Sequence, residues 1–176
     1  AYTARRITQI DIPNCRYIRF KGKYAYVSAY VGPVAMDPNA QKGAVFKVDL
    51  DTYKIVGQVT VGYQPDELAI IGGRAYVANS GGYRAPNYDS YAIIDVKKKR
   101  VVSRKFITDG TELDIVIPYG IAIHPRNGDI YVTDAKNYVS SGVLHCYSRE
   151  GVHKWSVRTG DIPAHMVFLE RKQTRQ

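Results

Sequence analysis

The segment KYAYVSA at residues 23–29 returns as GRAYVAN at residues 73–79 and as GDIYVTD at residues 128–134. Each copy places an apolar residue, a tyrosine and a valine before a small or polar residue. Self-similarity at a spacing of about fifty residues is typical of architectures in which every repeat is one supersecondary unit. The chain is therefore expected to consist of consecutive copies of one unit.

Further strand-like segments accompany each copy in a constant order. A proline-initiated apolar segment precedes it, beginning at Pro13, Pro65 and Pro118, and Pro163 starts a fourth. Two segments follow it, namely AVFKVD (44–49), YAIIDV (91–96) or VLHCYS (143–148), and then YKIVGQVT (53–60), RVVSRKF (100–106) or VHKWSVR (152–158). Four short strands per repeat, without a helical period, indicate one blade of a β-propeller.

The predicted fold is all-β, a partial β-propeller of about three four-stranded antiparallel blades plus edge strands of two neighbouring blades. The expected blades are residues 13–61, 62–107 and 108–161, with Tyr26, Tyr76 and Tyr131 at equivalent places. Residues 1–12 are expected to hold the outer strand of a preceding blade, 162–170 the first strand of a further blade, and 171–176 a polar tail. A β-sandwich is the alternative, but it has no reason to repeat one strand order and one proline position.

Three blades are fewer than a closed ring needs, because propellers usually close with about four to eight. An open arc leaves apolar faces and unpaired strand edges, which favour association. The expected partners are therefore missing propeller blades or a second copy of the chain.

The net charge of +9 favours anionic partners. Its densest run, residues 97–100 (KKKR), lies between two predicted strands, where a solvated hairpin turn is the usual explanation. A basic propeller that binds nucleic acid or another polyanion is a lesser alternative, recognisable by steep salt dependence. No apolar run approaches the ~18 residues of a membrane-spanning helix, and residues 1–6 lack the apolar core of a signal peptide.

The repeats resemble those of the YVTN and NHL families of bacterial propellers, most clearly in PYGIAIHP (118–125) followed by GDIYVTD (128–134). Residues 141–164 are similar to the C-terminal end of the YncE-like extracytoplasmic propeller lipoproteins of Bacteroidetes, a family that includes surface proteins capturing cobalamin. The resemblance implies a seven-bladed parent at the cell surface or in the periplasm of a Gram-negative bacterium. It also implies a corrinoid as candidate ligand and an outer-membrane transporter as candidate partner.

Recognition in a propeller falls to loops grouped on one face around the central channel. One set leads into the innermost strands, and the other joins the second and third strands at residues 29–43, 79–90 and 134–142. This second set is longer than the ~2 to 5 residues of a minimal turn and is rich in tyrosine, asparagine and glycine. The predicted ligand-binding residues are Tyr30, Tyr63, Tyr83, Arg84, Tyr88, Tyr119, Asn137, Tyr138 and His165, the last on a channel-lining strand.

Few features of the sequence indicate catalysis, since the chain has no phosphate-binding glycine loop, Cys-x-x-Cys, His-Glu-x-x-His or nucleophile elbow. The predicted function is non-catalytic capture of a small polar ligand or of a protein, with no catalytic residue, cofactor or metal. The enzymatic alternative is a regucalcin-like metal-dependent sugar-lactone hydrolase, in which Glu67, Asn79 and Asp134 would be the ligands of a divalent cation.

Overall fold

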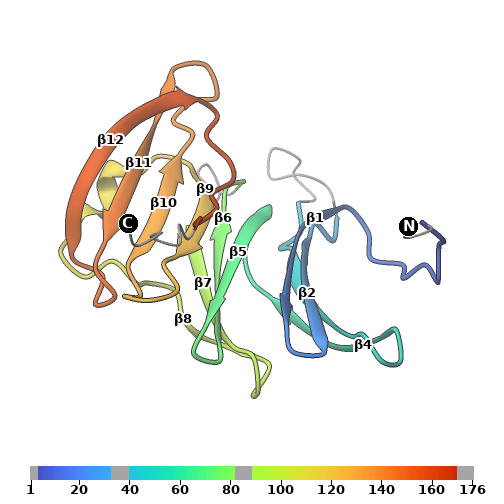
Figure 1. Cartoon of the computed structure of the whole chain (residues 1–176). Helices are drawn as coiled ribbons and strands as arrows, with labels where there is room; N and C mark the ends of the chain where they lie inside the picture. The colour runs from blue at the N-terminus through green and yellow to red at the C-terminus, as the bar shows by residue number, and fades with distance from the viewer. Residues whose placement is uncertain (1–3, 33–39, 82–88, 170–176) are drawn as a thin grey trace, which may run out of the picture.

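The computed structural model describes residues 4–32, 40–81 and 89–169. Within them the chain forms three antiparallel sheets of four strands each, arranged as consecutive blades of a β-propeller (Figure 1). The first blade contains β1 (Cys15–Lys21), β2 (Tyr24–Ala29), β3 (Ala44–Asp49) and β4 (Lys54–Thr60). The second contains β5 (Pro65–Ile71), β6 (Arg74–Asn79), β7 (Tyr91–Asp95) and β8 (Arg100–Ser103). The third contains β9 (Pro118–Ile123), β10 (Ile130–Asp134), β11 (Ser141–Tyr147) and β12 (His153–Asp161), and the 3₁₀ helix η1 (Thr111–Asp114) precedes it.

Strand register confirms the predicted repeat. Tyr26, Tyr76 and Tyr131 each occupy the same place on the second strand of a blade, opposite Arg19, Ala69 and Ala122 respectively. Because successive side chains of a strand point to opposite sides, each blade has two faces. The front face of a blade is the one that packs against the preceding blade; in the second blade it carries Leu68, Ile70, Ala75, Val77, Ala92 and Ile94.

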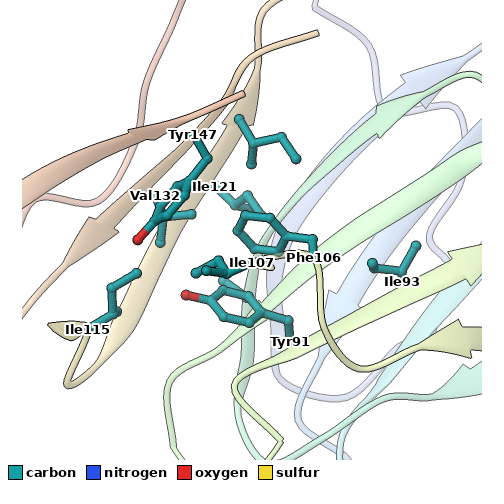
Figure 2. Close-up of a cluster of buried hydrophobic side chains, with 10 residues drawn as sticks. Tyr91, Ile93, Phe106, Ile107, Ile115, Ile121, Val132 and Tyr147 are labelled. Carbon is teal, nitrogen blue, oxygen red and sulfur yellow. The ribbon is translucent and has the colours of Figure 1, made fainter. Parts of the chain in front are cut away.

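The two interfaces between blades form the core. Front-face residues of the second blade pack against Tyr26 and Val45 of the first in one buried cluster. A larger cluster joins the second and third blades and includes the buried Phe106 and Tyr147 (Figure 2). Each blade is therefore stabilised mainly by burying one face on its neighbour, as in other repeat architectures.

The two predicted sets of loops lie side by side. The backbone N–H of Tyr30 donates to the carbonyl of Asn14, and that of Ser80 donates to Gln64 in the second blade. In the third blade the N–H of Ala135 donates to Ile117. The loop that follows the second strand of each blade is thus tied to the segment that leads into its first strand.

The two ends differ from the expected edge strands. Residues 4–12 and 163–169 join no sheet in the structure. A strand at residues 7–12 would be the outermost strand of a preceding blade, and it would need the third strand of that blade as its hydrogen-bonding partner. None of the three described blades provides this partner. Pro163 is nevertheless packed as Pro65 is, because a methyl group on Gly142 would meet its ring just as one on Gly43 would meet Pro65.

Among the residues that the structure describes, no helix has the length and apolarity needed to cross a membrane.

Candidate functional site

The first strands of the blades bring together residues from equivalent repeat positions. Cys15, Pro65 and Pro118 occupy one position, since each pairs with the last residue of the next strand. The following position holds Arg16, Asp66 and Tyr119, and the one after it holds Tyr17, Glu67 and Gly120. Counted from Pro163, the fourth repeat supplies Ala164 and His165 at these two positions. These side chains meet at the channel.

Asp66 lies at the bottom of this site with 8% of its side chain exposed. Its Oδ1 accepts hydrogen bonds from Tyr30 Oη (2.9 Å) and Arg16 Nε (3.3 Å), and its Oδ2 accepts one from Ser80 Oγ. Burial raises the pKa of Asp66, although these three donors oppose the shift. Burial and the neighbouring Asp66 also raise the pKa of the Tyr30 phenol, which therefore stays a donor at neutral pH.

Glu67 is the second buried carboxylate, with 1% of its side chain exposed. Arg19 Nη2 donates to Oε1 at 3.0 Å, and the backbone N–H of Ile121 in the third blade donates to Oε2 at 3.1 Å. His165 Nδ1 lies 3.7 Å from Oε1. Burial raises the pKa of Glu67, whereas Tyr17, Arg19 and His165 oppose the shift. One carboxylate thus contacts all three blades and the segment after them.

Aromatic rings orient the charged groups. The guanidinium of Arg16 lies over the Tyr30 ring at 5.1 Å, and that of Arg19 lies over Tyr17 at 4.2 Å. The other side of the site is closed by His165, whose ring stacks on Tyr17 with centroids 4.8 Å apart. Cation–π and stacking contacts of this kind restrict side chains to one orientation.

A cavity of about 130 Å³ opens between these groups, lined by Arg16, Tyr17, Asp66, Glu67, Tyr119, Ala164 and His165. The carboxylates are buried and already accept several hydrogen bonds each. Arg16 and His165 in contrast expose 43% and 64% of their side chains. The cavity therefore offers a ligand mainly donors and aromatic surface.

Only some of the residues predicted to bind a ligand lie at the cavity. Tyr119 and His165 line the cavity, and Tyr30 lies behind Arg16 and Asp66. Tyr138 packs edge-on against Tyr119 with centroids 5.8 Å apart. Three predicted residues, Tyr83, Arg84 and Tyr88, lie outside the described residues.

Two predicted residues have local roles instead. Asn137 closes its own turn, because its Oδ1 accepts the backbone N–H groups of Val139 and Ser140 at 3.0 and 2.8 Å. Tyr63 lies in the loop before β5, where Lys42 Nζ is 5.9 Å from its ring centroid. Neither residue lines the cavity.

Several residues of the site were not among the ligand-binding residues predicted from the sequence, including Arg16, Tyr17, Arg19 and Asp66. The signal that would have found Arg16 and Asp66 is the alignment of the repeats. The first strands of propeller blades are expected to be apolar, yet the position after the strand's first residue carries an arginine, an aspartate and a tyrosine in successive blades. Ionisable groups at equivalent positions of these strands point to a shared site.

The proposed metal ligands of the enzymatic alternative have other partners. Asp134 Oδ1 accepts the N–H groups of Ile117 (2.9 Å) and Lys136 (2.8 Å), and Oδ2 accepts that of Val116 (3.2 Å). Asn79 Nδ2 donates to the carbonyl of Asp89 at 2.9 Å. Across residues 4–32, 40–81 and 89–169, no group of three or more His, Cys, Asp or Glu side chains is placed to hold a metal ion.

Comparison with solved structures shows the propeller fold. The chain is similar to the β-propeller domain of the Trilobed protease from Pyrococcus furiosus, which has an open velcro topology, with 8% identity and a TM-score of 0.52 over 88% of this chain and 46% of that one. It is also similar to a chain of Kuenenia stuttgartiensis hydrazine synthase, with 23% identity and a TM-score of 0.62 over 94% of this chain and 42% of that one. At these identities the likeness concerns the fold alone.

A weaker likeness, with a TM-score of 0.46 and 17% identity, links 77% of this chain to 43% of a chain in a nidogen/laminin complex. The chain thus spans less than half the length of each of these three structures. No family model matches it, and no curated protein does.

Proposed function

We propose that this propeller segment binds a small polar ligand without transforming it, and that the cavity between Arg16, Tyr119 and His165 is the binding site. The observation that supports this is the cavity's construction: each blade and the segment after the third contribute to one set of polar and aromatic side chains. Ligand sites commonly combine aromatic walls with a few oriented polar groups. Since both carboxylates are buried and hydrogen-bonded, neither is presented as a general base.

A finer proposal rests on the resemblance to YncE-like propellers. It makes the protein an extracytoplasmic one that captures a corrinoid for an outer-membrane transporter. A cavity of about 130 Å³ admits only a group of a few atoms. A corrinoid would therefore place one phosphate or carboxamide there and rest its remaining surface on the loops around Tyr138.

Calorimetry with cyanocobalamin tests this finer proposal. If it holds, Tyr119→Ala weakens binding by about 1 to 3 kcal/mol. Tyr83→Ala and Tyr88→Ala are expected to do the same if the loop of the second blade shares the site. If the wild type binds cyanocobalamin and none of the three variants binds it more weakly, the site lies elsewhere. If the wild type gives no heat of binding, a corrinoid is rejected as the ligand.

The general proposal has its own test, which is a thermal-shift screen of small polar metabolites against the wild type and Tyr119→Ala. A ligand present at about 100 times its Kd stabilises the folded state by about 2.7 kcal/mol. The proposal requires at least one compound that raises the Tm of the wild type and not that of the variant. Equal shifts in both proteins would contradict it.

We further propose that the front face of the first blade packs against a blade of a second copy when the chain is isolated. This face carries Ile18, Phe20, Ala25, Val27, Phe46 and Val48, which match the buried front-face residues of the second blade position by position. A hollow of about 610 Å³ lies over it, and Phe20 is 65% exposed. Tyr131 of the third blade is equivalent to Tyr26 and Tyr76, and it is expected to supply the partner surface together with Phe168, which packs against it at 5.3 Å.

Sedimentation at several protein concentrations tests this association. The wild type is expected to self-associate and Phe20→Asp to remain monomeric, because the charge would be buried without a partner. Leu113→Asp is the control, since Leu113 is 86% exposed on the loop before the third blade. A monomeric wild type at high concentration would contradict the proposal.

A further inference from the structure

The guanidinium of Arg16 is a permanently charged cation in the wall of the cavity. Two arginines of β1 have similar settings. Arg16 bonds through Nε to the buried Asp66, and Arg19 bonds through Nη2 to the buried Glu67. Only Arg16 lines the cavity.

The attachment of Arg16 leaves its binding edge free. A guanidinium has five N–H donors in a planar fork. Asp66 engages Nε, and the Tyr30 ring covers one face of the group at 5.1 Å. Within the described part of the chain, no hydrogen bond is formed by Nη1 or Nη2. The paired terminal nitrogens match the two oxygens of a carboxylate or phosphate.

The remaining walls fit the same chemistry. The oxygens of Asp66 and Glu67 already accept hydrogen bonds, and 8% and 1% of these side chains are exposed, so they offer little to a cation. His165 adds a ring nitrogen at the opposite wall, and Tyr119 adds an aromatic surface. A volume of about 130 Å³ suits an anionic group with a short substituent.

We propose that the ligand carries a carboxylate or phosphate group, which binds the Nη1 and Nη2 edge of Arg16 inside this cavity. The inference rests on the proposed function, because it names the chemical class of the ligand at the same site. It adds that a neutral polar compound of equal size is rejected, since it offers the two terminal nitrogens no pair of charged oxygens.

Three small probes separate this inference from the proposed function. Acetate, inorganic phosphate and acetamide are titrated into the full chain while the His165 and Tyr119 ring resonances are followed by NMR. Acetate and phosphate are the two sources of the anionic group, and acetamide is the neutral match of acetate. We expect saturable shifts with at least one anion, the tighter of the two identifying the group, and none with acetamide.

Two variants assign the effect to Arg16. Arg16→Lys keeps the charge beside Asp66 but loses the fork, so the Kd for the anion is expected to rise roughly tenfold. Lys21→Gln removes a charge from an exposed position of the same strand that does not line the cavity, so the Kd is expected to stay within about twofold. Circular dichroism spectra establish that both variants are folded.

The outcomes are distinct. Acetamide binding as tightly as acetate, or an unchanged Kd in Arg16→Lys, would overturn the inference and leave the proposed function standing. Absence of binding by all three probes would overturn both.

Discussion

Tyr17 of the first blade and His165, which follows the third, stack with an angle of 28° between their rings. The start and the end of the arc of blades therefore meet across the channel. Glu67 reinforces the contact, because its Oε1 lies 3.7 Å from His165 Nδ1. The segment after the third blade is held in place by the first blade although it belongs to no sheet.

Replacing Tyr17 by Ala is expected to release this segment. The stacking partner of His165 disappears, and such contacts contribute about 0.5 to 1.5 kcal/mol. NMR order parameters of the backbone N–H groups of residues 164–169 should fall, while those of the core strands β6 and β10 stay high. Lys21→Ala, an exposed substitution on the same strand, is the control. Unchanged order parameters in Tyr17→Ala would show that other contacts hold the segment.

Gly120 provides a second test of the same contact. A methyl group at this position would collide with the Ala164 carbonyl oxygen and lie 2.7 Å from Thr133 Oγ1. Gly120→Ala is therefore expected to displace the segment that carries His165 and to lower the Tm. Gly160→Ala is the matched control, because nothing lies within 4 Å of its added methyl group. Equal Tm values for the two variants would contradict the close packing at Gly120.

Much of the fold was predictable, because every repeat has the same local signals. Apolar alternation and a tyrosine at a fixed place recur in all three blades, a proline begins the first strand of the second and third, and the register places Tyr26, Tyr76 and Tyr131 as expected. The edge strands at the ends were harder to predict. A strand forms only when a partner strand is present, and a sequence segment does not reveal whether one is.

The candidate site was only partly predictable. The tyrosine-rich loops could be predicted because their composition is unusual, and because loop residues can be recognised in a sequence without knowledge of packing. Arg16 and Asp66 form their ion pair only when two first strands lie side by side. His165 meets Glu67 and Tyr17 for the same reason, so contacts between distant segments decide the chemistry of the site.

Phe106 is expected to contribute strongly to stability. Its ring packs edge-on against Tyr91 (4.8 Å) and Tyr147 (5.7 Å) (Figure 2), and also against Tyr76 (6.4 Å), and so links the second and third blades. Phe106→Ala should lower the free energy of unfolding by about 3 to 5 kcal/mol, as measured by urea denaturation. The exposed Leu113 is the control, and Leu113→Ala should change it by less than about 0.5 kcal/mol. A loss below about 1 kcal/mol in Phe106→Ala would mean that the interface between the second and third blades contributes little to the free energy of unfolding.

The lowered pKa of His145 predicts how the free energy of unfolding depends on pH. Burial lowers the pKa of this side chain below its ordinary value; Lys136 and His153 lower it further, whereas Asp134 and Asp114 oppose the shift. The folded protein therefore keeps His145 neutral where the unfolded chain, with a pKa of about 6.5, already binds a proton. The free energy of unfolding should fall as the pH decreases through about 6.5, by at most about 1.4 kcal/mol per pH unit for this one proton, and level off below the lowered pKa.

His145→Phe removes that dependence with little change of shape, because Phe46 occupies the equivalent position of the first blade. Urea denaturation between about pH 5 and pH 8 should give a flatter stability profile for the variant than for the wild type. His124→Gln is the control for the loss of any histidine, and it should keep the slope of the wild type even if it shifts the whole curve. Parallel profiles for the wild type and His145→Phe would show that His145 is protonated equally in the folded and unfolded states, which its exposure of 5% argues against.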